Sequence, residues 1–418
     1  MTYKIVVIGG GAAGFFGATT CAEANPDAEV VLLEKTNKLL AKVLVSGGGR
    51  CNVTHHCFLP GPLSQHYPRG AKPLKEAFKT FGARETVTWF EERGVKLKTE
   101  ADGRIFPVTD SSQTIADCLL QQARKAGVTI KTGTGVTRIQ PPDHTTDKFI
   151  VYLNNGSELK ADKVLVSTGG NPKSTGYDWL RELGHPIQEP VPSLFTFNVP
   201  GNPLKELMGV SVPHAKVRIA GQKLEYEGPL LITHWGYSGP AVLKLSAWGA
   251  RIFHDQNYSF TALINWIPTY TEESLRAELQ HYRQAHPKKL VATNPLFGLP
   301  QRLWKALATI AEITLETKWA ELPGKNTNKL LEALLRMEVR VNGKTTFKEE
   351  FVTCGGIDLQ QVNMKTLESR LHPGLHFAGE VLDIDGITGG FNFQAAWTTG
   401  YLAGKAMAAE TILYHSNI

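Results

Sequence analysis

Three glycines and an acid near the start of the chain have the types and spacing that suit binding of a dinucleotide. Gly9, Gly11 and Gly14 follow one apolar run, and Glu34 ends the next. In this pattern the first glycine turns the strand, the second lets the backbone approach a pyrophosphate, and the third lets a helix pack closely. Helix N–H groups then bind the phosphates, and the acid binds a ribose. The pattern alone is weak in a chain with 40 glycines, but both flanking strands and the acid favour a dinucleotide site.

A second group of glycines and acids stands near the other end of the chain. Gly379 and Glu380 end one expected strand, and Gly389 and Gly390 precede an expected helix over 391–411. A chain that returns to the same ligand suits a long dinucleotide, so FAD fits better than NAD. We expect Glu380 to bond the ribityl or pyrophosphate region and the helix N-terminus to face the flavin, where its dipole would raise the reduction potential. Otherwise the two glycines form an ordinary loop before a core helix.

The segment 46–52 contains three consecutive glycines, which let a backbone wrap closely around a ligand and present N–H groups to an anion. Arg50 would neutralise a pyrophosphate or charge on a reduced flavin, and Asn52 would bond a flavin edge. Without the dinucleotide context, a flexible loop with a surface arginine would be the better interpretation. Cys51 is either a thiol beside the flavin or, as we favour, a small buried residue.

Four residues just beyond this segment invite a metal hypothesis. Cys51, His55, His56 and Cys57 offer two sulfurs and two imidazoles, which zinc binds in proteins. Side chains of adjacent residues cannot easily face one centre. We therefore predict no metal site.

The candidate proton donors lie in the middle of the chain. His234, Tyr237 and Ser238 stand in a segment framed by glycine and proline, and Arg104 is a further candidate. Hydride transfer needs a proton donor or acceptor near the reactive flavin atom, and burial can tune His and Tyr for that role. A tight turn that contains a hydrogen-bonded histidine explains the same segment equally well.

The elements that must position these groups fall into two domains. Residues 1–190 alternate strands and helices, which is typical of an α/β fold with a largely parallel sheet, and this texture returns in 352–418. Between them, 191–351 reads as an inserted substrate domain. Its β part covers 191–267 and 336–351 and includes an expected hairpin over 339–344, and a helical part covers 268–335.

The chain resembles the BaiN/YhiN-type flavoprotein family, whose members are NAD(P)/FAD-dependent or aminoacetone-oxidase-like oxidoreductases. The segment 42–45 departs mildly from the family pattern, and Phe391 stands where the family often has Tyr. The matching stretches cover nearly the whole chain in order: 6–14, 34–35, 46–52, 103–107, 168–170, 233–240, 353–357 and 388–392.

The resemblance implies a Rossmann-like FAD domain made from both chain ends, with an inserted β-barrel-like domain that carries a helical subdomain. The residues that we expect at the cofactor belong to the motifs above or lie beside them. They are Gly9, Gly11, Ala13, Gly14, Glu34, Lys35, Lys42, Ser46, Gly47, Gly48, Arg50, Cys51, Asn52, Val136, Thr168, Gly169, Gly170, Gly379, Glu380, Asp383, Gly390, Phe391 and Asn392.

The amino-acid composition limits the classes of protein to which the chain can belong. The 418 residues are 42% hydrophobic and 20% charged, as in an ordinary globular protein. The net charge is +6, and because the basic residues look dispersed we expect no nucleic-acid partner. Five cysteines without paired spacing indicate reduced thiols in the cytoplasm. No run approaches the roughly 20 apolar residues that cross a bilayer, so we expect no membrane partner.

These patterns predict an FAD-dependent oxidoreductase that exchanges hydride between flavin and a small or medium organic substrate. A side chain of the insert would transfer the proton across the domain cleft. We favour ene-type reduction over amine oxidation, with NAD(P)H as a transient donor. The alternatives are a flavoprotein that binds or modifies RNA, and a flavin redox sensor without turnover.

Overall fold

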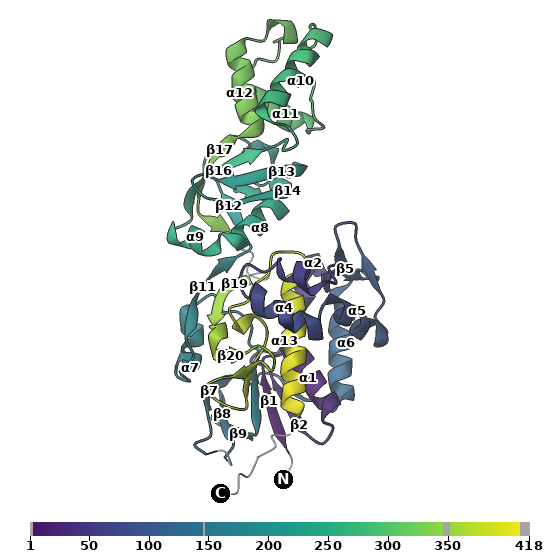
Figure 1. Ribbon diagram of the computed structural model, residues 1–418, viewed down its shortest axis with the longest axis vertical. Coiled ribbons are helices and arrows are strands. Elements are labelled where there is room, and N and C mark those ends of the chain that lie inside the picture. Colours follow the sequence, from purple (N-terminus) through teal and green to yellow (C-terminus); the bar gives the residue numbers. More distant parts are fainter. Residues whose placement is uncertain (1–2, 145–146, 346–351, 410–418) are drawn as a thin grey trace. The chain divides into compact units, whose positions relative to one another are not determined.

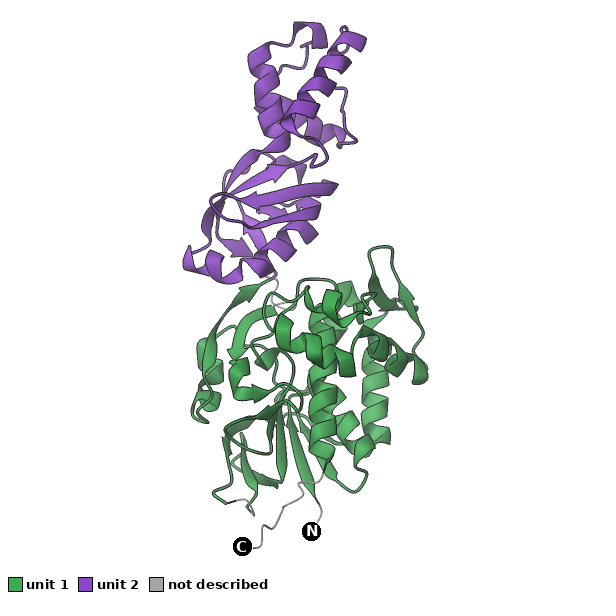
Figure 2. Ribbon diagram, viewed as in Figure 1, with its two compact units in different colours: residues 1–193, 348–418 green, residues 194–347 purple. Residues whose placement is uncertain are grey.

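The computed structural model describes residues 3–144, 147–345 and 352–409. The chain forms two compact units, which Figure 2 shows in green and purple. Unit 1 comprises residues 1–193 and 348–418, and unit 2 comprises 194–347. Both chain ends therefore contribute to unit 1. The boundaries expected from the sequence, 190/191 and 351/352, lie a few residues from these.

Unit 1 is built on a parallel sheet with two short antiparallel strands at one edge. The parallel strands run as apolar segments because helices and loops cover both faces of such a sheet. Their spatial order is that of a dinucleotide-binding sheet. The order of the parallel strands is β22 (Leu375–Phe377), β10 (Lys163–Val166), β1 (Lys4–Ile8), β2 (Glu29–Leu33) and β6 (Thr129–Lys131). Beyond β22, the antiparallel strands β21 (Glu368–Ser369) and β20 (Val362–Asn363) extend the sheet.

Helices α1 (Ala12–Ala24) and α13 (Phe391–Ala408) pack side by side on this sheet, as Figure 1 shows. Glycines allow the close approach: a Cβ on Gly404 would stand 2.5 Å from the carbonyl oxygen of Gly17. The helix expected over 391–411 ends at Ala408, and the residues from 410 onward lie outside the described ranges. Within the described ranges, neither α13 nor any other helix is long and apolar enough to cross a membrane.

Shorter elements complete unit 1 around this core. In chain order they are α2 (Ala41–Gly49), β3 (Thr54–His55), α3 (Pro60–Ser64), α4 (Ala71–Thr80), α5 (Ala83–Glu92), β4 (Leu97–Thr99), β5 (Arg104–Pro107), α6 (Ser112–Lys125), β7 (Val136–Gln140), β8 (Phe149–Leu153), β9 (Glu158–Ala161), η1 (Ser174–Tyr177), α7 (Asp178–Arg181), β11 (Ile187–Ser193), β19 (Val352–Ile357), η4 (Leu359–Gln361) and η5 (Gly379–Val381).

Unit 2 contains a seven-stranded antiparallel sheet with α8 (Pro240–Trp248) and α9 (Ala250–Asp255). A helical part follows the strand that ends at Asn265. It contains α10 (Glu272–Ala285), α11 (Gln301–Ile310), η3 (Trp319–Glu321) and α12 (Gly324–Leu335). The strand order is β17 (Met337–Asn342), β16 (Ser259–Asn265), β13 (Ser211–Ile219), β14 (Glu225–Ile232), β15 (Gly236–Ser238), β12 (Thr196–Asn198), β18 (Lys344–Thr345).

The two edges of this sheet are consecutive in the chain. Only Gly343 separates β17 from β18, yet β17 pairs with β16 and β18 pairs with β12. The sheet therefore curls until its edges meet, which gives the barrel-like form. The prediction of a hairpin over 339–344 was wrong, because in the described residues β17 and β18 do not pair with each other. Each pairs with a strand at a different edge of the sheet.

Candidate dinucleotide site

The first glycine turn has the geometry that the sequence motif requires. Gly9 has a φ of +113°, and a Cβ there would collide with the carbonyl oxygen of Ser167. A Cβ on Gly14 would collide with the carbonyl oxygen of Gly9. At Gly11, by contrast, a Cβ would have no described atom within 4 Å beyond its chain neighbours. Two glycines therefore serve packing, while Gly11 leaves open space at the N-terminus of α1, where a pyrophosphate would bind.

Glu34 is held in place at the end of β2. Its carboxylate accepts hydrogen bonds from the Gly10 N–H (2.9 Å), the Thr36 N–H (2.9 Å) and the Thr36 hydroxyl (2.9 Å). These bonds fix the acid beside the glycine turn. The oxygen that accepts from Gly10 keeps one lone pair, so the carboxylate can still accept a hydrogen bond from a ribose hydroxyl group.

A pocket of about 190 Å³ opens between Glu34 and the turn 168–170 that follows β10, which we call the second glycine turn. Seven of the expected cofactor residues line it: Gly9, Glu34, Lys35, Val136, Thr168, Gly169 and Gly170. The sequence analysis missed the remaining lining residues, which are Ile8, Leu33, Thr134, Gly135, Asn171, Gly176, Tyr177 and Trp179. The polar and aromatic residues among them follow β6 and β10, so their position after parallel strands was the available signal.

Two of the missed aromatic residues form one wall of the pocket. The Tyr177 hydroxyl accepts a hydrogen bond from the Asn171 N–H (2.9 Å), and burial raises the pKa of Tyr177 to about 12. The Trp179 indole donates to the carbonyl oxygen of Gly176 (3.2 Å). Both rings are therefore fixed. Tyr177 is buried, so the half-buried Trp179 is the ring against which a nucleoside can lie.

The triple-glycine segment breaks α2. Gly47, Gly48 and Gly49 have φ values of +58°, +68° and +82°. A Cβ on Gly48 or Gly49 would have no described atom within 4 Å beyond its chain neighbours. The Ser46 hydroxyl donates to the carbonyl oxygen of Val43 (2.9 Å) and so fixes the start of the turn. The turn presents bare backbone to open space, as a ligand cradle requires.

Cys51 is fully buried at the end of this turn. Burial raises the pKa of its thiol to about 12. A thiol with that pKa stays protonated near neutral pH, so it is a poor nucleophile. This favours a packing role for Cys51.

Polar atoms from both chain ends meet at the second glycine turn. The Lys42 ammonium lies 2.6 Å from one Glu380 oxygen, and the other oxygen accepts from the Thr353 N–H (2.8 Å). A Cβ on Gly170 would stand 2.5 Å from the Thr353 hydroxyl oxygen and 2.7 Å from Glu380. The Thr353 hydroxyl is buried and has no hydrogen-bond partner among the described residues. A ligand group that contacts this hydroxyl would satisfy it, so the residues here fit a bound dinucleotide.

Gly379 joins the C-terminal segment to α1. Its φ is +77°, a Cβ on it would stand 2.9 Å from the Ala13 Cβ, and its N–H donates to the Thr399 hydroxyl (2.9 Å). Further along the same loop, the Asp383 N–H donates to the carbonyl oxygen of Ile357 (3.0 Å). These contacts bring the returning segment against the N-terminal half of the site.

Arg50 and Arg104 are already compensated by acids of the neighbouring hairpin. Arg50 pairs with Glu100 (2.6 Å) and Asp110 (3.5 Å), and Arg104 pairs with Glu100 (3.0 Å). Both guanidinium groups also lie over the Phe106 ring, at 4.1 and 5.3 Å from its centroid. The backbone N–H groups at the N-terminus of α1 are thus better placed than Arg50 to bind a pyrophosphate.

The two asparagines expected at the cofactor, Asn52 and Asn392, hold the N-terminus of α13. With the Asn52 amide oriented to satisfy both its atoms, its oxygen accepts from the Gly390 N–H (2.9 Å) and its nitrogen donates to the carbonyl oxygen of Thr54 (2.9 Å). Asn392 makes two hydrogen bonds to Gly386, at 2.8 and 2.9 Å. Both amides therefore order the loop that leads into the helix.

Two histidine rings stack on Phe391 at the first position of α13. The ring centroids of His55 and His66 lie 4.9 and 4.2 Å from that of Phe391. The Tyr67 hydroxyl donates to the Phe391 carbonyl oxygen (2.6 Å). The sequence analysis considered His55 only as a metal ligand and missed His66, which stands in no recognisable motif. The two half-buried imidazoles are additional candidates for proton transfer.

The expected proton donors of unit 2 have different surroundings. Tyr237 is 1% exposed and donates to the Asn202 side chain (3.0 Å), and burial raises its pKa well above the usual value. Ser238 is half-buried in β15, opposite Leu231. His234 is exposed in a turn, and its ring lies edge-on to Trp235 at 4.0 Å. Of the three, His234 is the one that can exchange protons with solvent.

Comparison with known proteins agrees with this geometry. A family described as "HI0933-like protein Rossmann domain" matches residues 3–406. The 3-dehydro-bile acid delta(4,6)-reductase of Clostridium scindens is 28% identical over 97% of this chain and 99% of its own length. The ribosomal RNA dihydrouridine synthase of Escherichia coli is 30% identical over 97% of this chain and 98% of its own length.

A solved structure supports the fold alone. The 3-ketosteroid-delta4-(5alpha)-dehydrogenase of Rhodococcus jostii RHA1 matches with a TM-score of 0.51 and 15% identity, over 98% of this chain and 97% of that one. The predicted α/β, Rossmann-like FAD-binding fold is confirmed.

One expectation about partners is not supported. The dispersed charges argued against nucleic acid, but the Escherichia coli relative is named for ribosomal RNA. Family membership rests on the match over nearly the whole chain. The chain belongs to the HI0933-like family and is an FAD-dependent oxidoreductase.

Proposed function

We propose that this protein reduces a carbon–carbon double bond that is conjugated to a carbonyl group. The observation that carries the proposal is a reaction shared by two relatives with unlike substrates. In a 3-dehydro bile acid with 4,6 double bonds, the double bonds are conjugated to the C3 carbonyl. Dihydrouridine is uridine whose C5–C6 double bond, conjugated to the C4 carbonyl, has gained two hydrogen atoms.

The uracil ring of ribosomal RNA is the substrate that we favour. The Escherichia coli relative supports it, and so do the net charge of +6 and the sequence pI of about 8.9, which suit a polyanionic partner. A steroid-like enone is the second candidate, and the Clostridium scindens relative, which matches over 97% of the chain, supports it. NAD(P)H is the proposed electron donor in both cases.

Different residues of the site would bind different parts of the cofactor. FAD, when bound, supplies the hydride. Gly11 and the N-terminus of α1 would receive the pyrophosphate, and Glu34 the ribose of the adenosine. Lys42 and Thr353 would contact the middle of the cofactor. The N-terminus of α13 would favour negative charge on the reduced ring.

The second hydrogen arrives as a proton from the protein. Hydride adds to the carbon remote from the carbonyl, and the carbon beside the carbonyl then accepts the proton. We propose His234 as the donor because it is exposed and can be reprotonated by solvent. His66, beside Phe391, is the alternative donor within unit 1.

An anaerobic half-reaction experiment tests the proposal. The holoenzyme is first bleached with NADH or NADPH and then mixed with ribosomal RNA or with a 3-keto steroid that has a 4,6-diene. In a separate experiment the oxidised holoenzyme is mixed with a primary amine. The proposal predicts that the RNA or the steroid restores the oxidised flavin spectrum and gains two hydrogen atoms by mass spectrometry. It is contradicted if neither substrate reoxidises the flavin while amines bleach the oxidised enzyme.

A further inference from the structure

The net charge of this chain lies entirely in unit 2. Residues 194–347 contain 18 Lys and Arg and 12 Asp and Glu, while the rest of the chain contains 27 of each kind. Unit 1 is therefore neutral and unit 2 carries the whole +6. The basic residues are scattered along the sequence, but they are not shared evenly between the units.

Ion pairing within unit 2 leaves more basic than acidic side chains without an ion pair to a described residue. Most of its acids pair with a Lys, Arg or His side chain, and the acids that form no ion pair with a described residue are Glu273, Glu278 and Glu316. Ten basic side chains form none either: Arg218, Lys223, Lys244, Arg283, Lys288, Lys289, Arg302, Lys305, Lys325 and Lys344. Unit 2 thus offers many cations whose charge is not compensated locally.

Three of these lysines lie over aromatic rings. The tyrosines are half-buried, so the rings remain partly accessible. The distances from ammonium nitrogen to ring centroid are 5.3 Å for Lys244 over Tyr226, 4.8 Å for Lys344 over Tyr258, and 5.6 Å for Lys289 over Tyr282. Proteins that bind single-stranded nucleic acid combine basic side chains for the backbone with aromatic rings on which bases stack. This combination of cations and rings is the observation that favours a single-stranded nucleic acid as the partner of unit 2.

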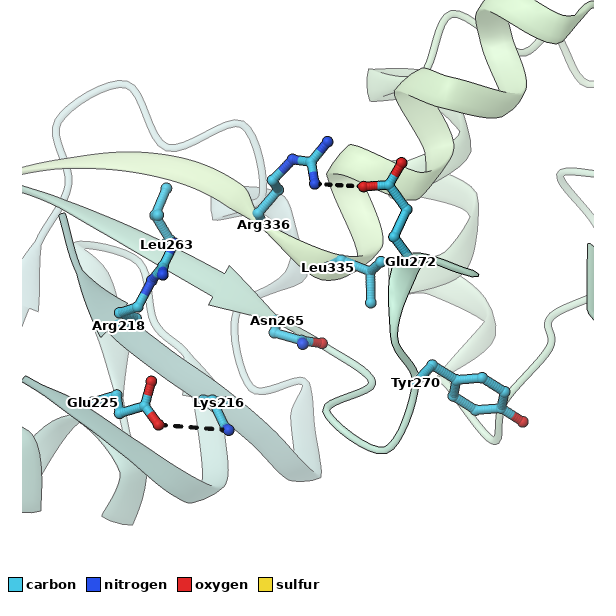
Figure 3. A pocket seen from close by; sticks show the side chains of 9 residues that line it. All are labelled: Lys216, Arg218, Glu225, Leu263, Asn265, Tyr270, Glu272, Leu335 and Arg336. Carbon is cyan, nitrogen blue, oxygen red and sulfur yellow. Dashed lines mark hydrogen bonds and ion pairs between the residues drawn. The ribbon is translucent and has the colours of Figure 1, made fainter. Parts of the chain in front are cut away.

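A pocket of about 310 Å³ lies within unit 2, between the outer face of the sheet and the ends of the helical part (Figure 3). The exposed Arg218 lines it from β13 and has no ion-pair partner among the described residues. Arg336 and Lys216 also line it, paired with Glu272 at 2.8 Å and Glu225 at 3.6 Å. A backbone phosphate could enter here and bind Arg218 while both flanking pairs persist.

We propose that unit 2 docks the RNA substrate, with its uncompensated basic side chains on the phosphates and its lysine-covered tyrosines beside the bases. This inference rests on the proposed function, because RNA is the substrate favoured there. It assigns binding to unit 2 and leaves the dinucleotide site to unit 1.

The test compares two full-length holoenzyme variants that lose the same charge. The unit 2 variant carries Lys223→Gln, Lys288→Gln, Lys305→Gln and Lys325→Gln. The control variant carries Lys72→Gln, Lys96→Gln, Lys125→Gln and Lys160→Gln in unit 1. All eight lysines are exposed and form no ion pair with a described residue.

Binding is measured by fluorescence anisotropy with ribosomal RNA and with an oligouridylate, from low to high salt. The slope of log affinity against log salt falls by about 0.7 for each lost contact to a single strand, so four contacts give a change of roughly 3. We expect that change and at least tenfold weaker binding at low salt in the unit 2 variant only. Bleaching by NAD(P)H should be equal in both variants.

The outcomes separate this inference from the proposed function. Equal weakening in both variants, or weakening in the control alone, contradicts docking on unit 2, even if dihydrouridine forms. RNA binding that depends on unit 2 but yields no dihydrouridine supports docking and contradicts RNA as the reaction substrate. Undetectable RNA binding by the unaltered protein contradicts docking and RNA as the substrate, whereas reoxidation of the flavin by the steroid would still support reduction of a conjugated double bond.

Discussion

Gly400 of α13 lies against the backbone of Ala13 in α1, and a Cβ on Gly400 would stand 2.6 Å from the carbonyl oxygen of Ala13. Gly404 meets Gly17 one turn further on, so the helices run parallel. Phe391 is nine residues before Gly400, so the N-terminus of α13 lies about 13 Å beyond this contact at a rise of 1.5 Å per residue. Two helix N-termini offset by this distance can bind the pyrophosphate and the flavin ring of one extended dinucleotide.

The Gly400→Ala variant tests this packing. The added methyl group must push the helices apart because it would meet backbone rather than a movable side chain. Overpacking of this kind costs about 1–3 kcal/mol of unfolding free energy. Urea unfolding followed by circular dichroism should show that loss, whereas Gly324→Ala, at an open helix start, should change stability little. A Gly400→Ala variant as stable as the parent would show that the helices do not pack this closely.

The Gly11→Leu variant tests the pyrophosphate cradle. Its side chain would enter space that no described atom occupies, so the fold should survive while FAD is lost. The flavin released from the purified protein by denaturation measures retention, and thermal unfolding checks the fold. The matched control is Gly324→Leu, which also faces open space. Full FAD content in Gly11→Leu would remove this turn from the cofactor site.

Stability should fall on acidification because of a buried histidine. His376 is 1% exposed, its Nδ1 lies 3.0 Å from the Thr366 carbonyl oxygen, and burial lowers its pKa to about 4. A pKa lowered by folding gives stability that is present above the unfolded value and lost as pH falls through the folded value. The window is therefore about pH 6.5 to 4.

The His376→Asn variant isolates this contribution. Asn keeps a donor for the Thr366 carbonyl oxygen and cannot gain a proton. Urea unfolding at pH 7 and pH 5 should show that the parent loses about 2 kcal/mol more than the variant between these values. An equal loss in both proteins would mean that His376 does not drive the acid sensitivity.

The proton-transfer role is tested at three positions. We expect His234→Ala to keep FAD and its bleaching by NAD(P)H, and to slow reoxidation by the substrate about 10²-fold or more, as for loss of a general acid. Tyr237→Phe should leave that rate nearly unchanged, because the buried hydroxyl serves Asn202. Stopped-flow spectra measure each half-reaction. A slow His66→Gln variant beside a normal His234→Ala variant would reverse the assignment.

The sequence predicted the parts of this protein that depend on local pattern. The glycines Gly9 and Gly14 and the strand before them were recognisable because the turn itself demands those residue types. The ion pairs of Arg50 could not be predicted from the sequence, because its partners Glu100 and Asp110 stand far along the chain, in and just after the β4–β5 hairpin. Trp179 was missed for a different reason: it follows β10, which was the available signal, but it belongs to no recognisable motif.

Charge was misjudged for a different physical reason. Basic residues are spread along the whole sequence, and no long stretch of consecutive basic residues marks unit 2. The excess becomes visible only when the chain is divided at 193/194 and 347/348 and the ion pairs are known. Compensation by neighbouring acids is a property of the fold, which a pattern of residue types does not contain.

Mixing the NAD(P)H-bleached holoenzyme with ribosomal RNA under anaerobic conditions tests the central claim most directly. The proposed function predicts that the oxidised flavin spectrum returns, and that digestion of the RNA releases dihydrouridine in proportion to the flavin reoxidised. If the flavin stays bleached with RNA and with the steroid dienone alike, reduction of a conjugated double bond is not the activity of this protein.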